Sequence, residues 1–185
     1  MKRILVVKGS PRAGGNTDLL ADKAIEGVLS KGGLVIEILL RNESIKPCIA
    51  CESCSDENID CIIEDDMKKF YKSIEEADGI ILASPVYWFN MSGQMKLFID
   101  RWFSVYMKNE LFLENKQAGI IMTYADEDAF SSGAVNAFRT FQDIFNHCGG
   151  EIAGIVHATA GESGEIATND ETLSKAFELG KKMAQ

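Results

Sequence analysis

The sequence is poor in histidine, with only two among its 185 residues. His147 falls at the end of an expected helix and His157 falls late in an expected strand, and the sequence identifies no partner for either. Two isolated imidazoles do not support a Ser-His-Asp triad, and no pair of carboxylates has a clear acid–base role. This absence is typical of a protein in which a bound cofactor supplies the chemistry.

Long apolar runs are also absent, because no stretch approaches the ~18–20 apolar residues that span a membrane. The first apolar run, Ile4–Val7, ends at Lys8, so it indicates a buried strand rather than a signal peptide. Positive charge is in deficit, with a formal net charge of −9, which opposes binding to nucleic acid or anionic membranes. We therefore expect a soluble, cytoplasmic protein with no nucleic-acid or membrane partner.

What the chain does contain is an alternation of apolar strands and amphipathic helices. Its length and the lack of an interdomain linker predict one domain spanning 1–185. The pattern predicts an α/β fold with a five-stranded parallel sheet covered by helices on both faces. The expected strands are 3–8, 34–40, 78–84, 117–123 and 151–158. The expected helices are 16–31, 65–76, 92–106, 129–147 and 170–183.

The stretch after the first strand combines glycines with polar donors. Free backbone N–H groups and the positive end of the following helix make such a turn an anion site. The chain has neither the lysine of a P-loop nor a Gly-x-Gly-x-x-Gly fingerprint, so a phosphate monoester suits this loop best. The alternative is an ordinary turn whose glycines only relieve strain. The candidate phosphate ligands are Ser10, Arg12, Gly15, Asn16 and Thr17.

Three consecutive aromatic residues follow the third expected strand, at the same edge of the sheet. Tyr87, Trp88 and Phe89 are costly to expose, and an extended segment cannot bury all three in one core. A flat apolar ring with a polar edge is a natural partner for such a loop. Packing at a subunit interface is the alternative, and both can hold together.

Three motifs together resemble the flavodoxin-like NAD(P)H-dependent FMN reductase family. They are Gly9-Ser10-Pro11-Arg12 with Gly15-Asn16-Thr17, Ser84-Pro85-Val86-Tyr87-Trp88, and Ser92-Gly93-Gln94-Met95-Lys96-Leu97-Phe98-Ile99-Asp100-Arg101. The resemblance implies a flavodoxin-like, doubly wound sheet, with FMN as cofactor and NAD(P)H as substrate. It also implies that Ser10, Arg12, Asn16 and Thr17 hold the FMN phosphate. The residues implied to contact the isoalloxazine ring are Pro85, Val86, Tyr87, Trp88, Phe89, Thr123, Tyr124 and Ala125.

Two features near the implied ring site are open to interpretation. Asp126, Glu127 and Asp128 follow Ala125, and such acids would lower the flavin potential if they lay close to the ring. Asp100 and Arg101 fit a structural ion pair or a subunit contact better than catalysis.

The resemblance implies an oxidoreductase that passes electrons from NAD(P)H through FMN to a small acceptor. A quinone, a free flavin or a nitro compound would serve as that acceptor. We expect a homodimer or a dimer of dimers. The first alternative is an iron–sulfur flavoprotein that carries electrons without its own NAD(P)H turnover and receives them from a partner such as ferredoxin. The second is a non-redox binding module.

Four cysteines lie in one long insertion loop, 41–64, with the spacing C-x2-C-x2-C-x6-C. They are Cys48, Cys51, Cys54 and Cys61. This spacing resembles the cysteine motif of iron–sulfur flavoproteins, a branch of the same family. A [4Fe–4S] cluster, a zinc ion and free redox-active thiols are all compatible with the pattern. The fifth cysteine, Cys148, is expected to be an inert buried thiol.

Overall fold

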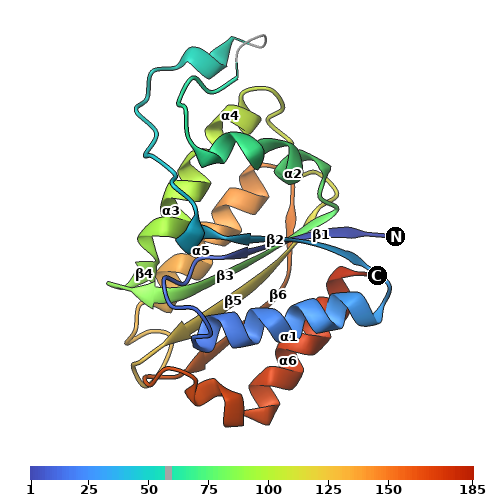
Figure 1. The fold of residues 1–185 in the computed structure, drawn as a ribbon, viewed down its shortest axis with the longest axis vertical. Coiled ribbons are helices and arrows are strands. Elements are labelled where there is room, and N and C mark those ends of the chain that lie inside the picture. The colour runs from blue at the N-terminus through green and yellow to red at the C-terminus, as the bar shows by residue number, and fades with distance from the viewer. Residues whose placement is uncertain (57–59) are drawn as a thin grey trace.

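The computed structural model describes residues 1–56 and 60–185, which fold as a central sheet between two layers of helices (Figure 1). Within these residues, five parallel strands follow the order β2-β1-β3-β5-β6, and β4 adds an antiparallel pairing to β3. This order is that of the flavodoxin-like, doubly wound fold, so the predicted fold class is confirmed. The strands are β1 (Arg3–Lys8), β2 (Leu34–Leu39), β3 (Gly79–Tyr87), β4 (Asn90–Met91), β5 (Gln117–Tyr124) and β6 (Glu151–Thr159).

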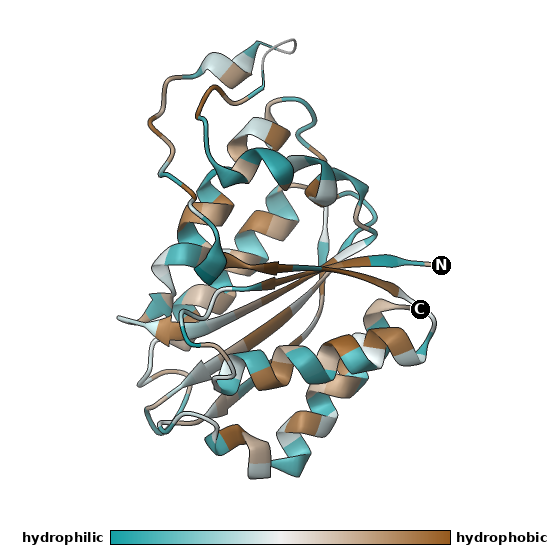
Figure 2. Cartoon of the chain, in the orientation of Figure 1, coloured by the Kyte–Doolittle hydropathy of each residue, from teal (hydrophilic) through white to brown (hydrophobic). Residues whose placement is uncertain are grey.

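Helices cover both faces of the sheet. They are α1 (Asn16–Ser30), α2 (Tyr71–Glu76), α3 (Gly93–Asp100), α4 (Phe103–Tyr106), α5 (Ala134–His147) and α6 (Asp170–Met183). Helices α1 and α6 pack against one face, and α2 to α5 lie on the other (Figure 1). Figure 2 shows hydrophobic stretches along the strands between them, and the central strands β1, β3 and β5 are buried along most of their length. None of the described helices is long and apolar enough to cross a lipid bilayer.

The structure corrects three helix predictions, each for a local reason. Expected helix 65–76 begins as a 3₁₀ turn, Asp66–Lys69, because the Asp65 side chain accepts a hydrogen bond from the Met67 N–H. Expected helix 92–106 is divided into α3 and α4. Expected helix 129–147 starts only at Ala134, because the Asp128 carboxylate accepts from two backbone N–H groups and shapes a turn instead. The expected strand 78–84 also continues to Tyr87 and turns back as β4.

The cysteine-bearing loop projects from the body of the molecule beyond α4 (Figure 1). Apart from a 3₁₀ turn at Ser53–Ser55, its described residues after Asn42 form no regular structure. Residues 57–59 of the predicted insertion 41–64 lie outside the described residues. The sheet order leaves the carboxyl ends of β1 and β3 as neighbours at the switch in strand order, where ligands of such folds bind.

Candidate functional site

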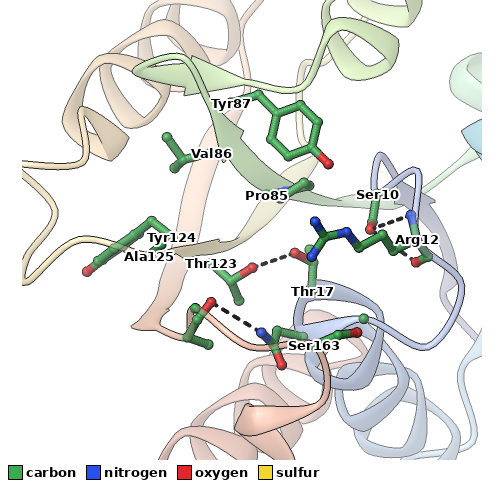
Figure 3. A pocket seen from close by; sticks show the side chains of 14 residues that line it. Ser10, Arg12, Thr17, Pro85, Val86, Tyr87, Thr123, Tyr124, Ala125 and Ser163 are labelled. Carbon is green, nitrogen blue, oxygen red and sulfur yellow. Dashed lines mark hydrogen bonds between the residues drawn. The ribbon is translucent and has the colours of Figure 1, made fainter.

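A cleft lies at this carboxyl edge, formed by the loops that follow β1 and β6 and by the carboxyl ends of β3 and β5 (Figure 3). All predicted cofactor-binding residues except Trp88 and Phe89 line it. They are Ser10, Arg12, Gly15, Asn16, Thr17, Pro85, Val86, Tyr87, Thr123, Tyr124 and Ala125. Sequence reasoning missed the fourth wall, which consists of Ala160, Gly161 and Ser163. The structure therefore brings distant segments together at one place, and their roles toward FMN remain predictions.

The loop after β1 points the N-terminus of α1 into the cleft. Gly14 adopts a φ of +66°, which an L side chain rarely tolerates, and its N–H donates to the Asp18 carboxylate at 3.1 Å. The N-cap residue is Gly15, and in the described part of the chain no side chain caps the helix. The N–H groups of the first turn are therefore available to an anion, as the sequence predicted.

Asp18 supports this loop from inside the molecule. Its carboxylate is buried and accepts a hydrogen bond from Arg41 at 2.8 Å. Burial raises the pKa of Asp18, whereas the charge of Arg41 acts to lower it. Because Arg41 offsets the negative charge of Asp18, this carboxylate opposes an anion at the helix terminus less than an unpaired one would.

Arg12 differs from the other arginines in having no carboxylate partner within the described residues. The other four arginines form the pairs Arg3–Glu76, Arg41–Asp18, Arg101–Asp65 and Arg139–Asp143. The Ser10 hydroxyl donates to the Arg12 carbonyl at 3.1 Å and accepts from the Arg12 N–H at 3.2 Å, which fixes the backbone of the loop. An exposed, unpaired guanidinium beside a free helix N-terminus has the charge and the donors that a phosphate needs.

The Asn16 and Thr17 side chains are engaged with other loops of the cleft. The Thr17 and Thr123 hydroxyls lie 2.7 Å apart and join α1 to the end of β5 (Figure 3). Asn16 Nδ2 donates to the carbonyls of Ala160 and Glu162. The predicted phosphate contact of Asn16 is thus confined to its backbone N–H, because its side-chain donors are already used.

The three aromatic residues divide between two environments. Tyr87 lines the cleft, whereas Trp88 and Phe89 form the two-residue turn between β3 and β4. Their φ angles are +51° and +65°, so both occupy the left-handed region that such turns require and that side chains disfavour. Trp88 is 93% exposed, and Trp88 and Phe89 line a second pocket that adjoins the cleft at Val86 and Tyr124. The hairpin therefore presents a strained, exposed aromatic tip beside the cleft.

His157 has a partner that the sequence did not reveal. Its Nδ1 lies 2.7 Å from the hydroxyl of Tyr124, two positions along the paired strand from Met122, the residue that His157 faces in the register of β5 and β6. Burial lowers the pKa of His157, and the charge of Lys175 lowers it further, so the neutral imidazole is favoured. This hydrogen bond orients Tyr124, a residue of the cleft wall.

The three acids after Ala125 lie on the same side as the aromatic tip. Asp126 lines the second pocket, together with Trp88 and Phe89. The Asp128 carboxylate is engaged by backbone N–H groups of its own turn, and those hydrogen bonds lower its pKa. All three side chains are exposed, so solvent screens their charge.

The four clustered cysteines do not form a metal site as placed. Cys48 and Cys51 are exposed, Cys54 is buried and Cys61 is half-buried. Within residues 1–56 and 60–185, no group of three or more histidine, cysteine or acidic side chains is arranged to hold a metal ion. These residues therefore do not fit a cluster or a zinc ion in this arrangement. Cys148 is buried, and burial raises the pKa of its thiol, as expected for an inert cysteine.

Arg101 is a buried residue that forms contacts with both ends of the cysteine-bearing loop. Its guanidinium and the Asp65 carboxylate are both only 1% exposed and lie 2.5 Å apart. It also donates to the carbonyl of Lys46 at 2.9 Å and contacts the Cys61 sulfur at 3.2 Å and the Tyr71 hydroxyl at 3.1 Å. The structural ion pair expected for this residue is therefore present, with Asp65 as the partner.

The fold is that of a flavodoxin-like α/β protein, and its cleft lies at the switch in strand order, where such folds bind their ligands. The model of the NADPH-dependent FMN reductase family matches residues 2–149, and the chain belongs to this family. It is accordingly an NAD(P)H-dependent flavin oxidoreductase with FMN as its cofactor. The fit of this cleft to FMN rests on the free N–H groups of α1 and the unpaired Arg12 at one end and the apolar and aromatic walls at the other.

Relatives and solved structures agree with this assignment. An iron-sulfur flavoprotein of Methanocaldococcus jannaschii is 32% identical over 99% of this chain and 96% of its own length. The Trp repressor binding protein from Bacillus subtilis is similar in structure, with 27% identity, a TM-score of 0.69 and coverage of 96% of this chain and 98% of that one. An NAD(P)H:quinone oxidoreductase from Methanothermobacter marburgensis shares the fold with a TM-score of 0.80 at 16% identity, covering 100% of this chain and 96% of that one.

Proposed function

We propose that the cleft binds FMN with its phosphate at the N-terminus of α1 and its ring between two walls. One wall is the end of β3, Pro85–Tyr87, and the other is Thr123–Ala125 at the end of β5. The protein then passes electrons from NAD(P)H to a small acceptor such as a quinone, a free flavin or a nitro compound. The observation that carries this proposal is the unpaired Arg12 beside the uncapped start of α1, in the same cleft as Tyr87 and Tyr124.

In this proposal the protein binds and orients, and the cofactor carries the redox chemistry. Bound FMN supplies a centre that takes a hydride from NAD(P)H and releases electrons to the acceptor. The backbone N–H groups of α1 and Arg12 fix the phosphate, and the carboxyl end of β3 supplies an apolar wall through Pro85 and Val86. Steady-state oxidation of NAD(P)H with a quinone tests the activity, and a protein that binds FMN without such turnover would be an electron carrier instead.

Arg12→Ala is expected to weaken FMN binding by about 1.5–3 kcal/mol, which is the contribution of a charge-assisted hydrogen bond. Riboflavin lacks the phosphate and should bind the variant and the wild type equally. Fluorescence titration of the FMN-free protein measures both affinities. Arg139→Ala is the matched control, because it removes the same charge from an exposed pair on α5. Equal FMN affinity in both variants would show that the phosphate lies elsewhere.

Tyr87→Ala is expected to weaken FMN binding by about 0.5–1.5 kcal/mol and to increase the fluorescence of the bound flavin, because an adjacent aromatic ring stabilises and quenches it. Trp88→Ala should have a smaller effect on affinity, since Trp88 lies outside the cleft. Titration and emission spectra distinguish the two variants. Undisturbed flavin binding together with a change from dimer to monomer on gel filtration would assign these residues to a homodimer interface instead.

The alternative function is that of an iron–sulfur flavoprotein that carries electrons. It is favoured by the names of curated relatives and by the spacing of the four cysteines. The relative from Methanocaldococcus jannaschii bears that name, and the C-x2-C-x2-C-x6-C spacing is present. This alternative requires the loop to rearrange from the arrangement described here. It predicts about four irons per chain in protein purified without oxygen, and a loss of that iron in Cys54→Ser with FMN retained. Iron-free anaerobic protein with four reactive thiols would exclude it.

A further inference from the structure

The loop after β6 forms one wall of the cleft, although it lies beyond the residues that the family model matches. The Ala160 N–H donates to the carbonyl of Tyr124 at 2.7 Å, so the loop begins beside the end of β5. Gly161 and Ser163 then line the cleft with Arg12. A segment near the C-terminal end of the sequence thus completes a site whose other walls come from the matched region.

The Asn16 side chain fastens this loop to the start of α1. Its Nδ2 donates to the carbonyl of Ala160 at 3.2 Å and to that of Glu162 at 2.7 Å, and its Oδ1 accepts from the N–H of Ile166 at 3.1 Å. The loop therefore wraps around the first residue of α1. All three bonds go to backbone atoms, so Asn16 fixes the path of the chain rather than the position of one side chain.

Ser163 is held next to this helix terminus with its hydroxyl available. The residues on either side are constrained, because the Glu162 N–H donates to the Glu165 carboxylate and Gly164 has a φ of +85°. Within the described part of the chain, the Ser163 hydroxyl forms no hydrogen bond to the protein. Ser10 and Thr17 differ in this respect, since both hydroxyls are already bonded. Ser163 and Arg12 are thus two unpaired side-chain donors of the cleft at the α1 terminus (Figure 3).

We propose that Ser163 is a cofactor-binding residue whose hydroxyl donates to the FMN phosphate together with Arg12. Asn16 is the positioning residue that keeps Ser163 there. This inference rests on the proposed function, because it requires FMN in the cleft with its phosphate at α1. A phosphate dianion offers more acceptor positions than one guanidinium fills, so a hydroxyl on the opposite wall adds a donor without competing with Arg12.

The test measures FMN and riboflavin binding to FMN-free protein by fluorescence titration. Ser163→Ala is expected to weaken FMN binding about tenfold, the effect of losing one hydrogen bond worth about 1.4 kcal/mol, and to leave riboflavin binding unchanged. Ser174→Ala, at an exposed position of α6, is the matched control and should bind both ligands as the wild type does. Ser163→Ala removes one exposed hydroxyl and is expected to fold normally.

Asn16→Ala tests the positioning role with a second readout. It should weaken FMN binding at least as much as Ser163→Ala and should speed hydrogen exchange of the Ile166 amide in FMN-free protein, because that N–H loses its acceptor. The double variant should bind FMN no more weakly than Asn16→Ala alone, since Ser163 then has no fixed position.

Three results would overturn the inference: unchanged FMN affinity in Ser163→Ala, equal weakening of FMN and riboflavin, or additive effects in the double variant. Failure of the proposed function has a different signature, since wild-type protein would then bind FMN no better than riboflavin.

Discussion

Arg101→Met is expected to lower the free energy of unfolding by about 3–5 kcal/mol, because it leaves the buried Asp65 carboxylate without its partner. Both side chains are almost fully buried, so water cannot replace the lost guanidinium. The same guanidinium contacts the Lys46 carbonyl and the Cys61 sulfur, so each end of the cysteine-bearing loop loses one of its contacts. Urea unfolding followed by circular dichroism measures the change.

The control for this prediction is Arg139→Met, which breaks an exposed pair with Asp143 within α5. That pair is exposed and screened by solvent, so Arg139→Met should change the free energy of unfolding far less than Arg101→Met does. A second readout is the rate at which iodoacetamide alkylates Cys61, which should increase in Arg101→Met because the sulfur is no longer held. Equal stability of the two variants would contradict the conclusion that the buried Arg101–Asp65 pair stabilises the fold.

The stability difference between wild type and Arg101→Met should also depend on pH. Burial acts to raise the pKa of Asp65, but hydrogen bonds from Arg101 and from the N–H groups of Lys46 and Met67 outweigh it, so the pKa lies below its usual value. A lowered carboxylate pKa stabilises the folded protein fully above the unfolded value near 3.9. That contribution is lost as the pH falls through the folded pKa. The difference should therefore be largest near neutral pH and should shrink as acid protonates Asp65, first in the variant, where Arg101 no longer lowers its pKa, and at lower pH in the wild type.

The order of strands and helices could be predicted from the sequence because buried parallel strands leave continuous apolar runs. The division of helix 92–106 could not, because its break comes at Arg101, whose partner Asp65 lies 36 positions earlier in the sequence. Local periodicity carries no information about such a contact. The helix starts at Ala134 because Asp128 forms a turn before it. Asp128 is a typical turn residue, but the apolar pattern of 129–147 favoured a longer helix in the sequence analysis.

In the candidate site, too, some parts could be predicted from the sequence and others could not. The loop after β1 and the ends of β3 and β5 could be placed together because parallel strands end at one edge; motifs marked the first two segments, and the family resemblance indicated the third. The loop after β6 carries no such motif, and its place in the cleft depends on Asn16, which bonds to residues at least 144 positions away. In the sequence, Asn16 follows Gly15 in a polar loop, and this pattern predicts a phosphate ligand. Only the fold shows that its side chain is occupied by another loop.

Gly180→Ala is expected to destabilise the protein by about 3 kcal/mol or more, because α1 and α6 cross with almost no space between their backbones. A Cβ at Gly180 would lie 1.9 Å from the carbonyl oxygen of Ala24, and a Cβ at Gly27 would lie 2.0 Å from that of Phe177. Backbone atoms cannot move aside as a flexible side chain can, so the helices must separate. Separation would open the core that Leu20 and its neighbours fill on this face of the sheet.

The loss should exceed the gain in helix propensity that glycine-to-alanine changes bring, which is at most about 1 kcal/mol. Gly93→Ala isolates that gain, because it lies at the first position of α3 and no atom lies within 4 Å of the added Cβ. We expect Gly93→Ala to be neutral or slightly stabilising in thermal unfolding, whereas Gly180→Ala and Gly27→Ala lower the melting temperature by many degrees. If all three variants changed the melting temperature by the same small amount, the backbones of α1 and α6 would have to lie far enough apart to accept a Cβ at Gly27 and Gly180. Since α1 also carries the proposed phosphate site at its first turn, separation of the helices should weaken FMN binding in Gly180→Ala but not in Gly93→Ala.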